Sequence, residues 1–510
     1  MNRILSLLLI AVCMLSILSG CTLEEPPYVP TGDALDNENN NTIHNRPQQE
    51  QALTLAYYPK RSMNPYTSTD FTNRALFPLL YQSLFSMDRN YNVIPVLCDR
   101  YSISGDMRTY TIYPAAAVFS DGSQLTAADV AASLKAAKEG AYYSGRFLHI
   151  QSITATADSV VITLDTPMEN LPLLLDMPIV KASQVDSELP LGTGPYVLED
   201  SPEGKRLRRT SYWWCSSDLA VTATHIPLVE ATSTSQIRDQ FEFADLGLVC
   251  ADPGSDTYAD YRCDYELWDM ENGMFLYLVC NTKSKVLKTA ELRAALTHAI
   301  NRDYLVETFY RGFARSATLP ASPLSPYYNQ TLAERYGYDS NQFADAVNAA
   351  NLQGTTVTLL LNADDSLRLR AGRAIATMLE DCGLKVKLVE VNSNEFLTQL
   401  KKGDYDLYLG QTRLSPNMDL TAFFTKNGKL NYGNLTNTTA YAMCLEALAN
   451  QGNYYNLHKE VMDSGLICPI LFRSYAVYAT RGLITNLTPS RDNMFYYSIG
   501  RTMADAMIKG

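Results

Sequence analysis

The chain lacks the short motifs by which several classes of enzyme are recognised. Its 510 residues contain no phosphate-binding P-loop, no dinucleotide fingerprint, no nucleophile elbow and no zinc-binding helix. The five histidines are widely separated without metal-ligand spacing, and no CxxC pair occurs. The sequence therefore predicts a protein that is not an enzyme and that holds no metal or other cofactor.

Positive charge is also scarce. The 42 Lys and Arg residues are outnumbered by 54 Asp and Glu residues, which gives a formal net charge of −12. No block of basic residues interrupts this balance, which repels nucleic acid and anionic lipid. We therefore expect no nucleic-acid partner.

Long apolar runs are absent except at the start of the chain. The run from Ile4 to Leu18 follows Arg3, which is typical of a signal peptide, and it is shorter than the roughly 20 residues of a membrane-spanning helix. It is followed by Ser19, Gly20 and Cys21, and the sequence Leu-Ser-Gly-Cys resembles the lipobox of bacterial lipoproteins. The resemblance implies a signal peptide over residues 1–20 and a mature protein whose lipidated Cys21 anchors it to the outside of the cell membrane. The alternative is ordinary secretion with an accidental cysteine.

Residues 21–51 are rich in Asn, Pro, Gln and acidic residues and have almost no apolar periodicity. Such a segment cannot bury enough surface to fold, so we interpret it as a disordered tether. Eight cysteines remain beyond Cys21, and we interpret them mainly as small buried residues. Cys250 and Cys263 are the closest pair and could form a disulfide.

In the first half of the body, apolar patterns predict a strand over 52–59 and a helix over 74–85. A Ser-Gly-Asp turn at 104–106 predicts a β-hairpin. Thr126 and Asp129 have the spacing of a capping box, which predicts that a helix begins after Thr126.

The second half predicts a buried strand over 274–282 and a helix over 289–312. Strand and helix patterns then alternate over 356–362, 368–384, 385–391, 393–403 and 405–411. This alternation indicates βαβ units around a parallel sheet, and ligands favour the carboxyl ends of such strands. Arg413 stands just after the last of them.

Several ordered motifs carry a family resemblance. They are the segment 80–134 with its Phe-Ser-Asp-Gly turn, the Gly-Thr-Gly-Pro-Tyr sequence at 192–196, the strand 272–282 and the helix 292–312. In this order they resemble the family 5 extracellular solute-binding proteins, the oligopeptide- and dipeptide-binding lipoproteins of ABC importers. The resemblance spans roughly residues 52 to 500.

The resemblance implies an α/β fold with two lobes that close on a ligand like a clamp, the first lobe carrying an extra domain. We expect the first lobe over 52–270, with the extra α/β domain at about 80–189, the second lobe over 271–474, and a return to the first lobe over 475–510. Hinge strands would lie near 268–274 and 471–477. The implied partners are a peptide or other small solute and the subunits of an ABC permease, with a monomer that contacts the membrane only through its lipid.

The segment after the strand 405–411 departs from the family's pattern. Many peptide-binding relatives have a tryptophan and an aspartate here, and the aspartate pairs with the peptide's amino terminus; this chain has Gln411 and Leu414 instead. A buried ammonium would have no partner at Leu414. The planar fork of Arg413 instead suits a carboxylate, phosphate or sugar hydroxyl, so we predict that it binds the ligand. The alternatives are that Arg413 pairs internally with Asp419 or points outward.

The full set of predicted ligand-binding residues comes from three segments. They are Gln411, Thr412, Arg413, Asn417 and Asp419 at the end of the last strand, Asn64, Tyr66 and Thr67 in a first-lobe loop, and Met274 on the inner strand. The predicted function is that of a lipid-anchored extracytoplasmic receptor that binds peptides for an ABC importer. The alternatives are another solute, such as a glycan or a metal chelate, or a surface lipoprotein with a scaffold, chaperone or sensory role.

Overall fold

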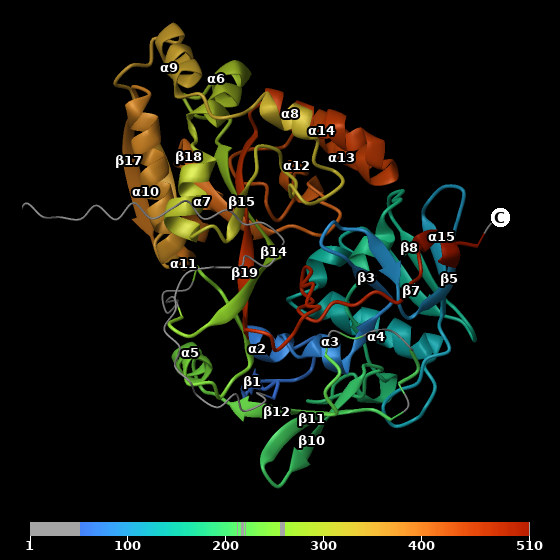
Figure 1. Ribbon diagram of the computed structural model, residues 1–510. Coiled ribbons are helices and arrows are strands. Elements are labelled where there is room, and N and C mark those ends of the chain that lie inside the picture. The colour runs from blue at the N-terminus through green and yellow to red at the C-terminus, as the bar shows by residue number, and fades with distance from the viewer. Residues whose placement is uncertain (1–51, 212, 216–218, 220, 255–260, 509–510) are drawn as a thin grey trace, which may run out of the picture. The chain divides into compact units, whose positions relative to one another are not determined.

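The structure is a computed structural model that describes residues 52–508 except 212, 216–218, 220 and 255–260 (Figure 1). The described residues all belong to one compact unit. The predicted signal peptide and tether, residues 1–51, lie outside the described residues. Helices and strands are mixed, as the sequence predicts.

Two long antiparallel strands form the centre of an eleven-stranded sheet within the described part of the chain (Figure 1). They are β14 (Tyr265–Cys280) and β19 (Ile467–Thr480), and nearly all of their residues are buried or half-buried. Both strands are long because each takes part in two halves of the sheet. In the first half of the sheet, β13 pairs with β19. In the second half, β18 pairs with β14 and β15 pairs with β19.

The first half of the sheet is built around three short parallel strands, β1, β12 and β13. Two antiparallel strands, β11 and β10, extend it, and the helix α5 follows β12. Ser233 begins this helix by accepting a hydrogen bond from the Gln236 backbone. The bounds are β1 (Leu55–Tyr57), β10 (Tyr196–Ser201), β11 (Gly204–Arg209), β12 (His225–Glu230), α5 (Thr234–Glu242) and β13 (Leu248–Ala251).

The second half confirms the predicted βαβ alternation. Strand β16 pairs in parallel with both β17 and β18, so the carboxyl ends of all three point the same way. The apolar residues of β16 are buried between helices, which explains its nearly continuous hydrophobic sequence. The bounds are β15 (Ala314–Ser316), β16 (Thr356–Asn362), α10 (Ser366–Asp381), β17 (Lys385–Val391), α11 (Ser393–Lys402) and β18 (Leu407–Arg413).

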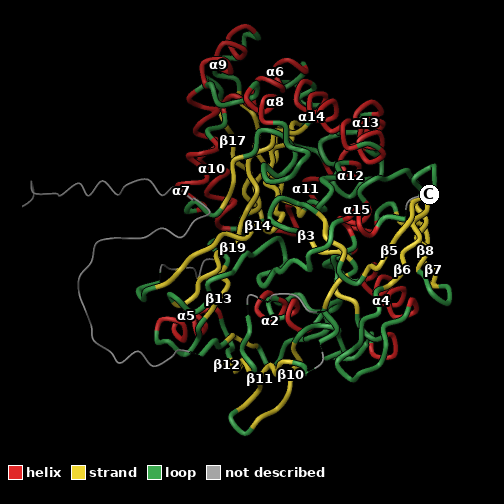
Figure 2. The backbone as a smooth tube through the Cα atoms, turned by 45° about the vertical axis from the view of Figure 1, so that its right-hand side comes forward, coloured by secondary structure: helices red, strands yellow, loops and turns green. Residues whose placement is uncertain are grey.

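A separate four-stranded antiparallel sheet lies within the predicted extra domain, and α4 packs on it (Figure 2). The predicted hairpin is confirmed as β5 paired with β6, and the predicted capping box is confirmed at Thr126 and Asp129. Two small strand pairs, β2 with β9 and β3 with β4, lie in the same region. The bounds are β2 (Gln82–Ser83), β3 (Phe85–Met87), β4 (Val93–Pro95), β5 (Cys98–Ile103), β6 (Thr109–Pro114), α4 (Ala127–Glu139), β7 (Ile150–Ala155), β8 (Val160–Leu164) and β9 (Pro178–Ile179).

Two helix predictions are wrong in extent. The predicted helix 74–85 is only two single turns, α2 (Phe71–Arg74) and α3 (Phe77–Leu80), and then the chain extends to pair as β2 and β3. Pro78 is tolerated because it stands in the first turn of α3. The predicted helix 289–312 is broken at Asn301, whose side chain caps a new helix by accepting from the Tyr304 backbone.

The remaining helices lie mostly within residues 271–474, the range predicted for the second lobe. Their bounds are η1 (Ser144–Phe147), η2 (Leu171–Leu174), η3 (Ala182–Gln184), α6 (Ala290–Ala295), η4 (Leu296–Ala299), α7 (Arg302–Tyr310), α8 (Gln330–Glu334), α9 (Ser340–Ala349), α12 (Thr421–Phe424), α13 (Thr438–Ala449), η5 (Gln451–Asn453), α14 (Tyr454–Asp463) and α15 (Met503–Ala506). Among the described helices, none has both the length and the hydropathy needed to cross a membrane. Cys250 and Cys263 are both free thiols.

The pairing of β14 with β19 is irregular at two places, and the larger interruption follows Glu271; a second shift separates Leu276 from Tyr277. Residues 265–271 of β14 pair with 474–480 of β19, whereas 275–279 pair with 467–472, and the register shifts between Glu271 and Phe275. Gly273 lies in this interruption with φ +73°, a conformation that favours glycine. The interruption falls inside both segments for which the family resemblance implies a hinge; the hinge itself stays a prediction.

Candidate functional site

The larger cavity of the candidate site, about 670 Å³ in volume, lies at the carboxyl ends of the parallel strands β1, β12 and β13. Its walls include 58–61 and 231–234, which follow β1 and β12, and 250–252, where β13 ends. Volumes of about 300–1,000 Å³ are typical of small-molecule sites, and the carboxyl ends of parallel strands are where such sites form. We call this space the strand-end cavity.

Aromatic and charged side chains line the strand-end cavity together. The aromatic rings include Phe71 and Tyr475, whose ring centres are 4.1 Å apart. The charged residues are three cations and two acids: Lys60, Arg61, Arg238, Asp70 and Asp252. Rings offer apolar contact area, whereas the excess of cations favours an anionic solute.

Arg473 of β19 connects the strand-end cavity to the second lobe. Its Nη2 donates to Asp252 Oδ1 at 2.8 Å, and its Nη1 donates to Gln411 Oε1 at 3.4 Å. Asp252 belongs to the predicted first lobe and Gln411 to the predicted second lobe. Gln411, one of the predicted ligand-binding residues, is therefore connected to this cavity through the side chain of Arg473.

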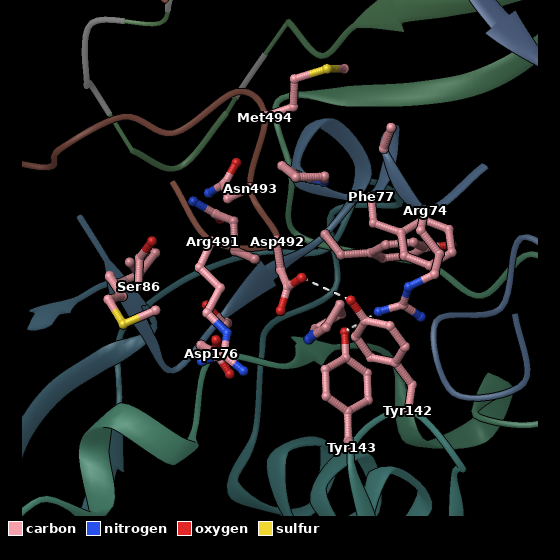
Figure 3. Close-up of a pocket in the computed structure, with 18 of the residues that line it drawn as sticks. Arg74, Phe77, Ser86, Tyr142, Tyr143, Asp176, Arg491, Asp492, Asn493 and Met494 are labelled. Carbon is pink, nitrogen blue, oxygen red and sulfur yellow. Dashed lines mark hydrogen bonds between the residues drawn. The ribbon is translucent and has the colours of Figure 1, made fainter. Parts of the chain in front are cut away.

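A second cavity, about 90 Å³ in volume, adjoins the first, and Phe71 lines both. We call it the arginine cavity, because Arg74, Arg146 and Arg491 line it together with Asp176 and Asp492. Figure 3 shows Tyr142 and Tyr143 pointing into the same region. The Tyr142 hydroxyl donates to Asp492 Oδ1 at 2.8 Å, and Arg74 Nη2 donates to the Tyr143 hydroxyl at 2.9 Å (Figure 3).

Asp492 is the carboxylate on which most of these contacts converge. It pairs with Arg413, its Oδ2 lies 3.2 Å from Arg146 Nη2, and it accepts from Tyr142. Burial alone would raise the pKa of Asp492, but the charges of Arg413, Arg491 and Arg146 outweigh burial and hold that pKa well below its usual range. The carboxylate is therefore ionised at neutral pH.

Arg413 pairs with Asp492 rather than with Asp419. Its Nε also donates to the Asn272 carbonyl at 3.0 Å, and its guanidinium lies 4.2 Å from the centre of the Tyr142 ring. Burial lowers the pKa of Arg413, but the charge of Asp492 raises it by more, so the side chain is a permanent cation. The pair links the end of β18 to the C-terminal segment and to the extra domain.

Asp419 and Asn417 contact the extra domain instead of either cavity. Asp419 Oδ2 lies 3.1 Å from His149 Nε2, while His149 Nδ1 lies 3.1 Å from Asp165. Asn417 is buried, and its Nδ2 donates to Asn170 Oδ1 at 3.4 Å. Both residues therefore join the predicted second lobe to the predicted extra domain.

The other predicted ligand-binding residues are scattered. Asn64 and Tyr66 are buried and bond the backbone carbonyls of residues 185, 187 and 178, whereas Thr67 is exposed. Met274 and Thr412 are half-buried on β14 and β18, and Met274 is paired with Arg413 in the sheet register. Ligand contact by these residues stays a prediction.

Arg146, Arg491 and Asp492 are not among the residues predicted from the sequence. The last two lie in an Arg-Asp-Asn segment that reads as an ordinary polar loop 79 residues beyond Arg413, and no local pattern connects the two places. One weak signal was present in β14. Gly273 interrupts an otherwise buried strand, and a glycine there indicates a close approach of other atoms, which are those of the Arg491 guanidinium.

Among the described residues, no cluster of three or more His, Cys, Asp or Glu side chains could hold a metal ion. Residues 92–434 match the family model of the bacterial extracellular solute-binding proteins, family 5. The glutathione-binding protein GsiB of Escherichia coli is 24% identical over 352 residues, which cover 66% of this chain and 68% of GsiB.

Solved structures share the fold. NikA from Brucella suis in complex with Fe(III)-EDTA superposes with a TM-score of 0.68 at 18% identity, over 87% of this chain and 98% of NikA. The unliganded open form of MppA, a periplasmic murein tripeptide binding protein, gives 0.70 at 16% identity, over 88% and 98%. These likenesses confirm the predicted two-lobed α/β fold. Since the family model covers two thirds of the sequence, the chain belongs to the family 5 bacterial extracellular solute-binding proteins, the substrate-binding receptors of ABC transporters, which are not enzymes.

Proposed function

We propose that the protein captures an acidic peptide in the strand-end cavity and delivers it to the permease of an ABC importer. The single observation that carries this proposal is the position and size of that cavity: it opens at the carboxyl ends of three parallel strands and measures about 670 Å³. That volume suits a solute of a few residues. Arg473 and Gln411 bring the second lobe against the same space.

The charges around the strand-end cavity support an acidic solute. Three cations face two acids; Asp252 is already paired with Arg473 and Arg238 with Asp239, which leaves Lys60 and Arg61 against Asp70. The relative GsiB is named for binding glutathione, a peptide with carboxylate groups. A metal chelate is the second candidate, because the related fold of NikA holds Fe(III)-EDTA and cationic side chains would suit its carboxylates equally well.

A free amino terminus is not a required feature of the proposed solute. Leu414, which replaces the aspartate of peptide-binding relatives, is buried and apolar. Asp419, the nearest acid in the following loop, already bonds His149 and the Thr421 backbone. Both observations support recognition through the solute's acidic groups.

The proposal also keeps the predicted anchor and lobes. Lipidated Cys21 would hold the protein at the outer face of the cell membrane, with 21–51 as the tether. The first lobe over 52–270 and 475–510, with its extra domain at about 80–189, would close on the second lobe over 271–474. The monomer would contact the membrane through its lipid alone.

The test is ligand-induced closure. Saturating glutathione or another acidic peptide should lower the radius of gyration in small-angle scattering and raise the melting temperature, because the solute binds only the native state. The solute should be recovered chemically unchanged, and acetylating its amino terminus should change its Kd only slightly. If no peptide or chelate in a broad collection compacts the protein, the receptor proposal fails.

A charge-matched pair of variants locates the binding site. Lys60→Glu combined with Arg61→Glu reverses two exposed cations at the strand-end cavity and should weaken an acidic peptide at least about 10-fold. The control, Lys385→Glu with Lys387→Glu, makes the same charge change on the exposed residues of β17. Equal loss of affinity in both would show that only net charge matters.

A further inference from the structure

Arg491 is a buried arginine with unused hydrogen-bond donors. Arg491 is only 5% exposed, and its Nη2 donates to the Leu414 carbonyl. Its Nε and Nη1 are also buried, and neither has a hydrogen-bond partner among the described residues. A buried donor without an acceptor costs free energy, so the site needs a further group.

Another buried arginine shows that such donors can all be satisfied in this fold. Arg302 is 4% exposed, and all three of its guanidinium nitrogens donate. Its acceptors include the carbonyls of Pro469 and Thr297 and the Thr297 hydroxyl. Four other arginines, at 146, 293, 315 and 368, each leave one buried nitrogen without a hydrogen-bond partner among the described residues, whereas Arg491 leaves two.

The space beside Arg491 is the arginine cavity. A volume of about 90 Å³ holds several waters, since a single water needs about 10–15 Å³ of such space, but it is too small for a whole peptide. Asn493 also lines it, and the Oδ1 of its amide has no partner among the described residues either. Rotation of that amide would turn its NH₂ group toward an incoming acceptor.

The charges around the cavity favour an anion. Four arginines, at 74, 146, 413 and 491, lie around Asp492, either in contact with it or close to it. The acids of this cluster are Asp176 and Asp492. Glu271 faces Arg491 from the opposite side, where it accepts from the hydroxyls of Tyr91 and Ser322. Counting Glu271 as ionised, one positive charge remains uncompensated.

We propose that the arginine cavity is a subsite for one carboxylate group of the solute, received by the unused donors of Arg491 beside the Asp492 carboxylate. This inference rests on the proposed function, and it narrows the solute class to those with a carboxylate on a short, slim arm. Phe71 lines both cavities, so a solute in the strand-end cavity can extend such an arm past its ring. The guanidinium of Arg491 lies against Gly273, where the β14–β19 register is interrupted, so an occupied subsite also braces the predicted hinge.

The test uses sodium acetate as the probe and acetamide as its neutral isostere. Acetate should raise the melting temperature saturably, by about 1–3 °C at ten times its Kd, whereas acetamide and equimolar sodium chloride should not. In ¹⁵N–¹H spectra, acetate should shift the Nε–H signal that is absent in Arg491→Gln. This variant should lose the acetate response, while Arg373→Gln, which removes an exposed cation paired with Glu390, should keep it.

The outcomes separate this inference from the proposed function. If acetate and acetamide behave alike in the unsubstituted protein, the carboxylate subsite is refuted, whether or not Arg491→Gln folds. If peptides close the protein equally well when every carboxylate is converted to an amide, the subsite is refuted while the receptor proposal stands. If acetate binds through Arg491 but no solute closes the lobes, the receptor proposal fails and the anion site remains.

Discussion

Three arginines surround the carboxylate of Asp492, and each contributes to keeping it ionised. Arg413 and Arg146 contact it directly, and Arg491 adds its charge from the next position along the chain. Asp492 has φ +63°, which is uncommon for a residue with a side chain. The surrounding contacts therefore hold this residue in place against its own backbone preference, and their removal should be measurable.

Arg413→Ala should lower the free energy of unfolding by about 1–3 kcal/mol. Breaking a buried ion pair is costly, but Arg146 and Arg491 remain to compensate the charge of Asp492. The loss of stability should therefore be smaller than for a buried pair whose remaining charge has no other partner. Arg413→Lys should recover only part of it, because an ammonium cannot both reach Asp492 and stack on Tyr142. Urea unfolding measures the difference, with Arg373→Ala as the exposed-pair control; equal effects would contradict the argument.

His149 should make stability depend on pH. Burial lowers the pKa of His149, but its hydrogen bonds and charge interactions with Asp419 and Asp165 raise it by more, to above its ordinary value. Its contribution is therefore fully present below the unfolded pKa of about 6.5 and is lost as pH rises through the folded pKa. His149→Gln should cost about 1.5–3 kcal/mol at about pH 6 and much less at about pH 9.

The measurement is urea unfolding of both proteins at the two pH values. His225→Gln is the matched control, because His225 is exposed on β12. A cost of His149→Gln that is the same at both pH values would show that the imidazole acts only as a neutral hydrogen-bonding group.

At the scale of elements, local signals could be predicted and distant pairings could not. The capping box at Thr126 and Asp129 depends on residues three apart, so the sequence contains the whole interaction. The prediction of a helix over 74–85 was wrong because Gln82 and Ser83 pair with residues 178–179, about a hundred positions away. That pairing overrides the local helical pattern. Arg413 was found by its place at a strand end, whereas its partner Asp492 has no local signature.

Gly273, where β14 is interrupted, and Gly122 should differ in what their replacement by alanine costs in stability. Gly273 and Gly122 both have positive φ, +73° and +83°, but a Cβ at Gly273 would collide with the Arg491 guanidinium, whereas Gly122 has no atom within 4 Å. Gly122→Ala should cost about 1 kcal/mol from backbone conformation alone. Gly273→Ala should cost about 1–3 kcal/mol more, because Arg491 must also move. Equal losses in urea unfolding would show that Arg491 is not held at this position.

For the whole molecule, several polar contacts join residues of the two predicted lobes, among them Arg413 with Asp492, Arg473 with Asp252, and His149 with Asp419. Each of these three joins residues at least 79 positions apart in the sequence. The family and the two-lobed fold could be predicted because their motifs are contiguous and ordered. The contacts between lobes could not, because opposite charges occur throughout the chain and the fold alone selects which of them meet.

The predicted attachment of the protein to the membrane depends on one atom, the sulfur of Cys21. If the Leu-Ser-Gly-Cys sequence directs acylation, Cys21→Ala should leave the described body folded and its solute binding unchanged, because that body begins some thirty residues later. Several acyl chains give durable anchoring, so their loss should move most of the protein from the membrane fraction to the soluble extracytoplasmic fraction. Fractionation followed by immunoblotting measures the distribution, and Cys98→Ala, which removes a buried thiol of the body, serves as the cysteine control. Retention of Cys21→Ala in the membrane fraction would mean that an uncleaved apolar segment, rather than lipid, holds the protein there.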